Sequence, residues 1–323
     1  MIVSTINNYT LMEKQAANIE FGDGMTYHNP VMLNESIDYL ITDPDGIYVD
    51  VTYGGGGHSR EILKRLGENG RLIVFDVDGD AFMNRPDDSR LTLVNQNYRY
   101  LWNYLKYYDA IPVNGVLADL GVSSHQIDDY ERGFAIRKDG ELDMRMNNQS
   151  GKTAKDILNT YSEEELTHIF KDYGEIEKPY FLIRDILNFR EDNFFETTAD
   201  LKAVAMKSAP RNKEFKYLSQ VFQAVRIEVN AELDALAEML RQIAVILKSG
   251  GRVAVISYHS LEDRMVKNLF RTGNIEGVEQ KDFYGNKITP FEVITRKPVI
   301  PSDDEITLNG RARSAKLRVA QKI

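Results

Sequence analysis

Short apolar runs alternate with helical stretches through the first 125 residues of the chain. The apolar runs have the length and the β-branched content of buried strands, and they cover Ile47–Val51, Arg71–Phe75, Leu91–Val94 and Val116–Leu120. A glycine loop and a helix-like stretch, Ser59–Leu66, follow the first run. Strands that alternate with helices in this way predict a parallel sheet covered by helices, which is an α/β fold.

From about residue 130 to residue 217 the pattern changes to helical spacing without strand-like alternation. The stretch Thr153–Tyr173 predicts two helices, and Ser162 with Glu165 forms a capping-box pattern at the start of the second. Further helices are expected at Pro179–Arg190 and Ala199–Met206. The middle of the chain therefore reads as a helical insertion.

The α/β pattern then returns. A long amphipathic helix is expected at Ala231–Leu247, with Gly250 and Gly251 ending it, and a buried strand at Arg252–Ser257. We expect an α/β domain made of two segments, 27–129 and 226–323, with a helical substrate-binding domain at 130–225 inserted between them. Residues 1–26 are expected to form an extension outside both domains.

Composition excludes several kinds of chemistry. The 323 residues include no cysteine, so disulfides, cysteine-held clusters and a cysteine nucleophile are excluded. The five histidines show no HExxH-type spacing, and no metal site is expected. No apolar run approaches the roughly 18 residues of a membrane span, and no targeting segment is evident, so we expect a cytoplasmic protein without a membrane partner.

The net charge of −9 argues against a protein that coats nucleic acid by bulk attraction. Two local runs are nevertheless basic. One is the tail Asn309–Ile323, with Arg311, Arg313, Lys316, Arg318 and Lys322, and the other is Lys207–Lys216. Each run alone is compatible with a solvated face, whereas the two together favour an anionic partner.

The stretch between the first strand and its helix, Asp50-Val51-Thr52-Tyr53-Gly54-Gly55-Gly56-Gly57-His58-Ser59, predicts a cofactor loop. Glycines let the backbone approach a ligand, and the helix N-terminus receives an anionic group. As a dinucleotide fingerprint the loop fails, because Ser59 stands where the third glycine is needed. The spacing Asp50-x-Thr52-x-Gly54-x-Gly56 is similar to the loop of S-adenosylmethionine-dependent methyltransferases.

Polar and aromatic side chains follow the other strands. Asp76 ends the second strand, where an acid accepts hydrogen bonds from ribose hydroxyls. Tyr98, after the third strand, is a candidate for the adenine, although it also suits an ordinary core. Asp119 and Gln126 flank the end of the fourth strand, where they could contact the methionine end of the cofactor or the reacting amine.

Two look-alikes are set aside. Gly151-Lys152-Thr153 is similar to a P-loop, but Met146 stands where its first glycine is required. Ser260 and Asp263 have the spacing of a capping pair for a helix near Leu261 rather than that of a hydrolase triad.

At this point the chain resembles the bacterial methyltransferases that modify the exocyclic N4 of a cytidine in small-subunit (16S) ribosomal RNA, the RsmH/MraW family. The matching segments run from residue 28 to residue 320 in one order. They include His28-x-Pro30-Val31, the glycine loop, Asp119-Leu120-Gly121-Val122-Ser123-Ser124-x-Gln126, Glu131-Arg132-Gly133-Phe134, Leu142-Asp143-Met144-Arg145-Met146, Phe222-Gln223-Ala224-Val225-Arg226-Ile227, Ile256-Ser257-Tyr258-His259-Ser260-Leu261-Glu262-Asp263-Arg264 and Arg311-Ala312-Arg313-Ser314-Ala315-Lys316-Leu317-Arg318. Tyr258, where the family usually has Phe, and Gly310, where it usually has Pro, are departures outside the loop.

The resemblance implies a Rossmann-like methyltransferase sheet with an inserted helical domain, S-adenosyl-L-methionine as cofactor and 16S ribosomal RNA within the small subunit as substrate. It also implies cofactor contacts at Gly56, Gly57, His58, Asp76, Tyr98, Asp119 and Gln126. It leaves the proton acceptor open, as well as the choice between monomer and homodimer.

The catalytic candidate is Asp119. Many amine methyltransferases place an Asp/Asn-Pro-Pro-Tyr/Phe tetrad after the fourth strand, and here only the acid of that tetrad is present. Asp119 would accept hydrogen bonds and then the proton of the amine, or it would bind the methionine amino group instead. A nicotinamide dehydrogenase and a non-catalytic ribosome-binding factor remain as alternatives.

The candidates for RNA contact are Arg226, Asn230, His259, Arg311 and Arg313. Gln223, Arg226 and Asn230 share one face if their stretch is helical, and this polar face would read a splayed base or its phosphate. The alternative is a hydrogen-bonded hinge between the two domains. His259 is a candidate because it follows the fifth strand and faces the expected cleft.

Overall fold

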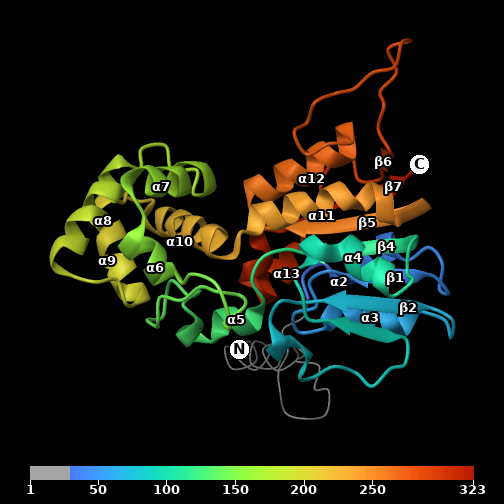
Figure 1. Cartoon of the computed structure of the whole chain (residues 1–323), viewed down its shortest axis with the longest axis horizontal. Coiled ribbons are helices and arrows are strands. Elements are labelled where there is room, and N and C mark those ends of the chain that lie inside the picture. The colour runs from blue at the N-terminus through green and yellow to red at the C-terminus, as the bar shows by residue number, and fades with distance from the viewer. Residues whose placement is uncertain (1–29) are drawn as a thin grey trace, which may run out of the picture.

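The structure is a computed structural model, and it describes residues 30–323. The extension expected at residues 1–26 and His28 of the first matching segment therefore lie outside the described residues. The described chain forms an α/β body and a lobe of helices that stands beside it (Figure 1).

The body is built on one mixed sheet. Within residues 30–323 seven strands pair in the order β3-β2-β1-β4-β5-β7-β6. The strands are β1 (Ile47–Asp50), β2 (Arg71–Phe75), β3 (Leu91–Val94), β4 (Val113–Asp119), β5 (Leu247–Ser257), β6 (Phe291–Val293) and β7 (Lys316–Lys322). The first five run parallel, and β7 is antiparallel to both of its neighbours. The expected α/β class and the four early strands are confirmed.

Alternating side chains of the strands supply two separate cores. Ile73 and Phe75 of β2 point to one face of the sheet, where α4 (Leu101–Tyr107), α11 (Glu232–Ile246) and α12 (Ser260–Thr272) cover them. Leu72 and Val74 point to the other face, beneath α2 (Leu33–Leu40) and α3 (Gly57–Arg65).

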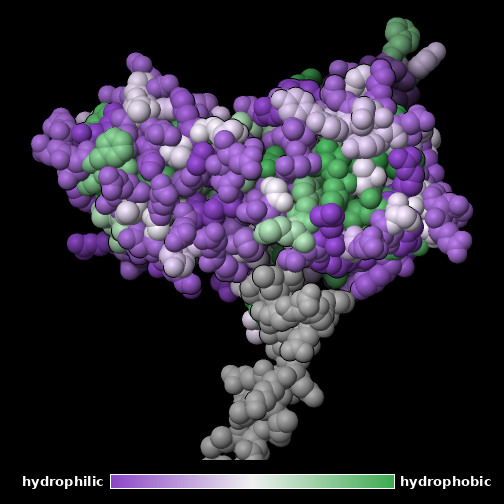
Figure 2. All heavy atoms as spheres, turned by 60° about the horizontal axis from the view of Figure 1, so that its bottom comes forward, coloured by the Kyte–Doolittle hydropathy of each residue, from purple (hydrophilic) through white to green (hydrophobic). Residues whose placement is uncertain are grey.

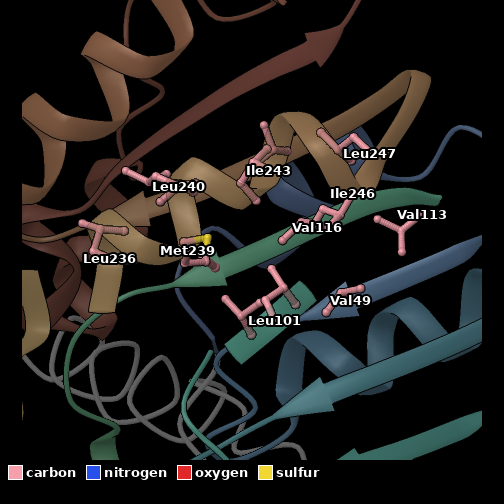
Figure 3. Close-up of a cluster of buried hydrophobic side chains, with 14 of the residues drawn as sticks. Val49, Leu101, Val113, Val116, Leu236, Met239, Leu240, Ile243, Ile246 and Leu247 are labelled. Atoms are coloured by element: carbon pink, nitrogen blue, oxygen red, sulfur yellow. The ribbon is translucent and has the colours of Figure 1, made fainter. Parts of the chain in front are cut away.

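Helix α11 supplies much of the first core. Its apolar face meets β1, β4 and α4 through side chains that are almost fully buried, namely Leu236, Met239, Leu240, Ile243 and Ile246 (Figure 3). Each such side chain stabilises the fold by about 1.5–3 kcal/mol relative to exposure.

The last strand corrects the sequence-based description of the tail. Lys316-Leu317-Arg318-Val319 alternates cationic and apolar residues, whereas the sequence analysis describes this segment only as part of a basic run. In the structure Leu317 and Val319 are fully buried in the second core, and β7 lies between β5 and β6. Alternation with a period of two is a strand pattern, and its meaning depended on partner strands that are remote in sequence.

The lobe of helices has its own core of buried residues between Leu142 and Val225. Its helices are α6 (Ala154–Thr160), α7 (Glu163–His168), α8 (Tyr180–Asp192), α9 (Thr198–Ser208) and α10 (Glu214–Asn230). The expected capping box of Ser162 and Glu165 is present at the start of α7. Figure 2 shows that the surface of this lobe is mainly hydrophilic, whereas a hydrophobic area faces the viewer on the α/β body.

The lobe returns to the body at a sharp junction. Helix α10 continues through the boundary expected between residues 225 and 226, and Val229 still packs on the core of the lobe. The chain turns at Ala231, which has a left-handed φ of 47°, and α11 begins at the next residue. The break in the backbone thus lies at Ala231, where the apolar face of α10 ends.

Candidate cofactor site and active centre

The loop after β1 lies at the point where the order of the sheet reverses. The chain proceeds from β1 outward to β2 and β3, whereas β4, on the other side of β1, leads to β5. Ligands of open α/β sheets bind in the crevice at the carboxyl ends of such strands. The site expected from the sequence therefore occupies the position that this topology provides.

Glycines are required in the loop for steric reasons. Gly54 and Gly56 have φ values of 51° and 72°, a region that side chains other than glycine rarely adopt. A Cβ atom on Gly57 would lie 2.1 Å from Cγ of Pro30. A bulkier residue at position 56 or 57 would therefore displace the loop or the segment that covers it.

Asp50 holds the loop in shape. Its buried carboxylate accepts hydrogen bonds from the backbone N–H of Thr52 at 3.1 Å and from the hydroxyl of Ser59 at 2.6 Å. Thr52 in turn accepts a hydrogen bond from the backbone N–H of Asp119 at 2.7 Å. The first glycine of the usual methyltransferase loop is thus replaced by a side chain that joins β1 to β4.

Asp76 follows β2 and faces the same loop. One carboxylate oxygen accepts from the N–H of Gly54 at 2.7 Å, and the other accepts from the N–H of Asp78 at 2.9 Å. Burial outweighs these hydrogen bonds and raises the pKa of Asp76 to about 6. Its position at the end of the second strand is the one expected for a ribose acceptor.

Asp78 lies beside the candidate residues and is absent from those expected from the sequence. Its buried Oδ2 accepts from Nε2 of Gln126 at 3.0 Å and from Nη1 of Arg132 at 3.2 Å. Gln126 also forms a capping box with Ser123 at the start of α5 (Ser124–Asp128). Nothing near Asp78 in the sequence indicates this role, because the burial of Arg132, which requires an acidic partner, is visible only in the structure.

Asp119 ends β4 at the centre of the crevice. Its Oδ1 accepts a hydrogen bond of 2.8 Å from the hydroxyl of Tyr258, and its Oδ2 lies 3.7 Å from Nδ1 of His58. Burial raises the pKa of Asp119 to about 7, the Tyr258 hydrogen bond lowers it, and the charge of Glu262 raises it. Burial also lowers the pKa of His58.

Tyr98 lies in the short helical turn Tyr98–Tyr100 and is partly buried against the core beneath α11. Burial raises the pKa of its phenol, so the ring is neutral. This position is compatible with both roles considered for Tyr98 from the sequence, a contact with adenine and an aromatic residue of the core.

Two of the candidates for RNA contact are engaged within the protein. Arg226 makes two hydrogen bonds to Glu232, at 2.8 and 3.0 Å, across the junction of α10 and α11. Asn230 donates to the carbonyl of Met144 at 2.8 Å and accepts from the N–H of Met146 at 2.7 Å. These contacts favour the alternative role for this polar face, a hydrogen-bonded hinge between the lobe and the body.

His259 is the N-cap of α12, and it forms a capping box with Glu262. The capping pair expected from Ser260 and Asp263 is therefore wrong: Asp263 binds Arg318 of β7 through two hydrogen bonds, at 2.6 and 3.1 Å. The helix begins one residue earlier than the sequence pattern suggested, because an imidazole nitrogen takes the capping position.

A possible metal cluster occurs in the same place. Glu232, His259 and Glu262 place ligand atoms within 4.8 Å of one another. Both oxygens of Glu232 already accept from Arg226, however, so this carboxylate is neutralised by a guanidinium rather than offered to a cation.

The cations of the two basic runs differ in their exposure to solvent and in their ion pairs. Arg311 pairs with Asp128 at the surface, and Arg313 is exposed. Lys316 and Arg318 both pair with Asp263. In the second run, the four cations Lys207, Arg211, Lys213 and Lys216 are all exposed, between the end of α9 and the first turn of α10.

The residues of the crevice fit S-adenosylmethionine. Asp50, Asp76, Asp78 and Asp119 gather at the carboxyl ends of β1, β2 and β4, and in Asp76 and Asp119 burial disfavours the charged form. A cationic sulfonium and ammonium would stabilise these carboxylates, whereas the pyrophosphate of a dinucleotide would be repelled. The strand order, the glycine loop and these acids together define an S-adenosylmethionine-dependent methyltransferase.

Comparison with known proteins identifies the family. The model of the MraW methylase family matches residues 25–323. Proteins named ribosomal RNA small subunit methyltransferase H are 54% identical in Bacteroides fragilis, over 92% of this chain and 98% of theirs, and 52% identical in Flavobacterium johnsoniae, over 93% and 99%. A solved rRNA methylase of Streptococcus thermophilus aligns over 93% of this chain and 99% of its own, with 13% identity and a TM-score of 0.40. The chain belongs to the MraW methylase family, as its resemblance implied.

Proposed function

We propose that this protein transfers a methyl group from S-adenosylmethionine to the exocyclic N4 of a cytidine in 16S ribosomal RNA of the small ribosomal subunit. The observation that carries the proposal is Asp119, a carboxylate with a pKa of about 7 at the carboxyl end of β4, beside the glycine loop. Family membership and the methyltransferase H relatives support the substrate.

Cofactor binding follows from the strand ends. Asp76 would accept hydrogen bonds from the ribose hydroxyls, and Gly56, Gly57 and His58 would line the methionine end. Tyr98 would flank the adenine, and Gln126, oriented by Asp78, would close the site. When bound, S-adenosylmethionine supplies a methyl group made electrophilic by the positive sulfur.

Proton handling falls to Asp119. The N4 amine of cytosine is a weak nucleophile because its lone pair is delocalised into the ring. Asp119, held by Tyr258, would accept a hydrogen bond from the amine and would take its proton as the new N–C bond forms. A pKa near the working pH suits a general base. Alignment of the methyl group with the amine supplies a further part of the acceleration.

The target base has to leave its stack to reach the crevice. We assign this task to the lobe of helices, residues 130–225, as the substrate-binding domain. Arg311 and Arg313 are exposed and are the proposed substrate contacts, together with the half-buried His259. Arg226 and Asn230, which bind Glu232 and the backbone of Met144 and Met146, are proposed as the hinge beside this surface instead. Among residues 30–323, none of the helices has the length and apolar character of a membrane span. We place the protein in the cytoplasm because its proposed substrate is ribosomal.

The test is methyl transfer from isotopically labelled S-adenosylmethionine to small subunits taken from cells that lack this chain, followed by mass spectrometry of the nucleosides. The expected product is N4-methylcytidine, at one position of 16S ribosomal RNA. Asp119→Asn should abolish the transfer while the protein still binds subunits. Labelled product in another base, or none, would overturn the proposal, and subunit binding without transfer would favour a non-catalytic binding factor.

A further inference from the structure

A group of cations lies outside the site described above, between α12 and the edge of the sheet. Lys267 and Arg271 lie one turn apart on α12, and Arg296 and Lys297 follow β6. These four residues line one shallow groove whose walls also include Phe270 and Val293. We call them the groove cations.

No acid of the described chain neutralises the groove cations directly. Among residues 30–323 none of the four forms an ion pair, whereas Arg318 at the same groove is bound by Asp263. Arg271, Arg296 and Lys297 are exposed. Unpaired cations gathered in a groove create a local positive potential that a net charge of −9 does not reveal.

The nearby acids do not cancel this potential. Glu292 of β6 is flanked by Phe291 and Val293, which pack on the core beneath α12, so its side chain points to the opposite face of the strand. Glu279 pairs with Lys287, which is the main cause of its lowered pKa, and the charge of Arg271 makes only a smaller contribution. The groove itself is lined by no carboxylate.

A protruding hairpin begins at the same corner of the molecule. Helix α12 ends at Gly273, and the chain extends away from the body before it returns to β6 (Figure 1). Lys281 and Lys287 pair across this hairpin, and at its tip Phe283 and Tyr284 are 98% and 86% exposed. These are the two most exposed large hydrophobic side chains among the described residues.

The tip has a defined shape. Asp282 accepts hydrogen bonds from the N–H groups of Tyr284 and Asn286, at 2.9 and 2.8 Å, and Gly285 takes a φ of 84°. The rings of Phe283 and Tyr284 are nearly perpendicular, with centroids 5.6 Å apart. Their faces are therefore presented in two directions by a turn that internal hydrogen bonds hold in place.

We propose that the groove cations and the aromatic tip form a second RNA-binding surface, at which Lys267, Arg271, Arg296 and Lys297 contact phosphates and Phe283 or Tyr284 stacks on an unpaired base. Cations neutralise phosphates, and aromatic rings stack on bases irrespective of sequence, so the combination suits single-stranded segments of a structured RNA. The surface lies at the last turns of α12. The N-terminus of this helix is at the crevice, and its C-terminus is about 20 Å away along the helix axis. The surface would hold the enzyme on RNA away from the methylated cytidine.

This inference rests on the proposed RNA substrate, and the experiment separates the two. Binding of protein-free 16S ribosomal RNA, and separately of intact small subunits, is measured over a range of salt concentrations for the wild type, for Lys267→Glu/Lys297→Glu and for Phe283→Ala/Tyr284→Ala. The matched control is Lys106→Glu/Lys248→Glu, which carries the same change of charge outside the groove. Affinity for S-adenosylmethionine and the melting temperature report on the folded state, and Arg296→Glu/Lys297→Glu replaces the first variant if that variant does not fold.

The groove variant should bind RNA more weakly, with a log–log salt slope smaller by roughly 0.7 for each lost phosphate contact. The tip variant should lose roughly 5- to 150-fold in affinity with the salt slope unchanged. The control should bind as the wild type does. If the groove and tip variants bind RNA as the control does, this proposal is overturned, whereas the proposed methyl transfer is not. Variants that lose binding only to intact subunits would also overturn it, because the surface would then contact a ribosomal protein. A wild type that neither binds nor methylates small subunits would instead defeat the proposed function.

Discussion

The hydroxyl of Tyr258 donates a hydrogen bond of 2.8 Å to Oδ1 of Asp119, and this contact joins the carboxyl end of β5 to that of β4. The bond opposes the effect of burial, because it stabilises the ionised carboxylate. Tyr258 thus has a direct contact with the proposed proton acceptor.

Tyr258→Phe tests this contact. Without the hydroxyl, the pKa of Asp119 should rise by roughly one unit from its value of about 7, since a hydrogen bond to a charged group is lost. His58 and Glu262 remain near the carboxylate and do not replace the donor. The acidic limb of the pH–rate profile should therefore move to higher pH, and the rate should recover in alkaline buffer.

The measurement is kcat/KM between pH 5.5 and 9.5. Tyr107→Phe, which loses a hydroxyl from an exposed ring, is the control and should leave the profile in place. If the pH–rate profile of Tyr258→Phe overlays that of the wild type, the rate does not depend on the ionisation of Asp119.

Asp76→Ala should weaken binding of S-adenosylmethionine by about 1–3 kcal/mol, because ribose hydroxyls would lose their acceptor in a buried place. The backbone N–H of Gly54, which now donates to Asp76 at 2.7 Å, would also lose its partner. Calorimetry measures the affinity, and Asp80→Ala, at an exposed position nearby, serves as the control. Equal affinity in a folded Asp76→Ala protein would remove this residue from the cofactor site.

The raised pKa of Asp119 also predicts how stability of the ligand-free protein depends on pH. The carboxyl group has a pKa of about 7 in the folded state and about 3.9 in an unfolded chain. Between these values the folded state binds more protons, so the free energy of unfolding falls as pH rises from about 4 to 7 and levels off above. The loss is at most about 1.4 kcal/mol per unit of pKa difference.

Asp119→Asn should flatten this decline, because an amide does not titrate. Urea unfolding at pH 5 and pH 8, at constant ionic strength, supplies the comparison. Asp76 also has a raised pKa and keeps part of the dependence in the variant. An equal decrease in the free energy of unfolding from pH 5 to pH 8 in wild type and variant would show that the pKa of Asp119 is not raised in the folded state.

Arg226→Ala distinguishes the hinge from a substrate contact. The arginine binds Glu232 through two hydrogen bonds, and both side chains are largely buried. Removing it leaves an unpaired buried carboxylate, which should cost about 3–5 kcal/mol of stability and lower the melting temperature. Cofactor and RNA affinity should fall together, and Arg226→Ala/Glu232→Ala should recover part of the stability. A normal melting temperature with weaker RNA binding alone would assign Arg226 to the substrate.

The candidate cofactor residues could be predicted from short stretches of the sequence. The glycine loop, Asp76 and Asp119 could be predicted because each stands at a strand end, and a strand end is recognisable within a few residues of sequence. Asp78 was missed because its partners, Gln126 and Arg132, follow it by about 50 residues and only the folded chain brings them together. A single acid after a strand has no local feature that marks it as the acceptor of a buried guanidinium.

The same limitation explains the errors at the other end of the chain. The cations of β7 suggested phosphate contacts, yet Arg318 is held by Asp263 on α12, 55 residues earlier in the sequence. Asp263 had itself been assigned to the cap of its own helix, because a local partner was the only one visible. Charges could be counted from the sequence, but the neutralised ones could be told from the free ones only in the structure.

The lobe of helices enters after β4 and leaves through Ala231 before α11, so two covalent crossings connect it to the body. A module on one linker can tumble freely, whereas a module on two linkers retains chiefly rotation about the line that joins them. Asn230, bound to the backbone at Met144 and Met146, clamps the two crossings together and shortens that line. Movement of the lobe relative to the body is thereby restricted chiefly to rotation about this short line.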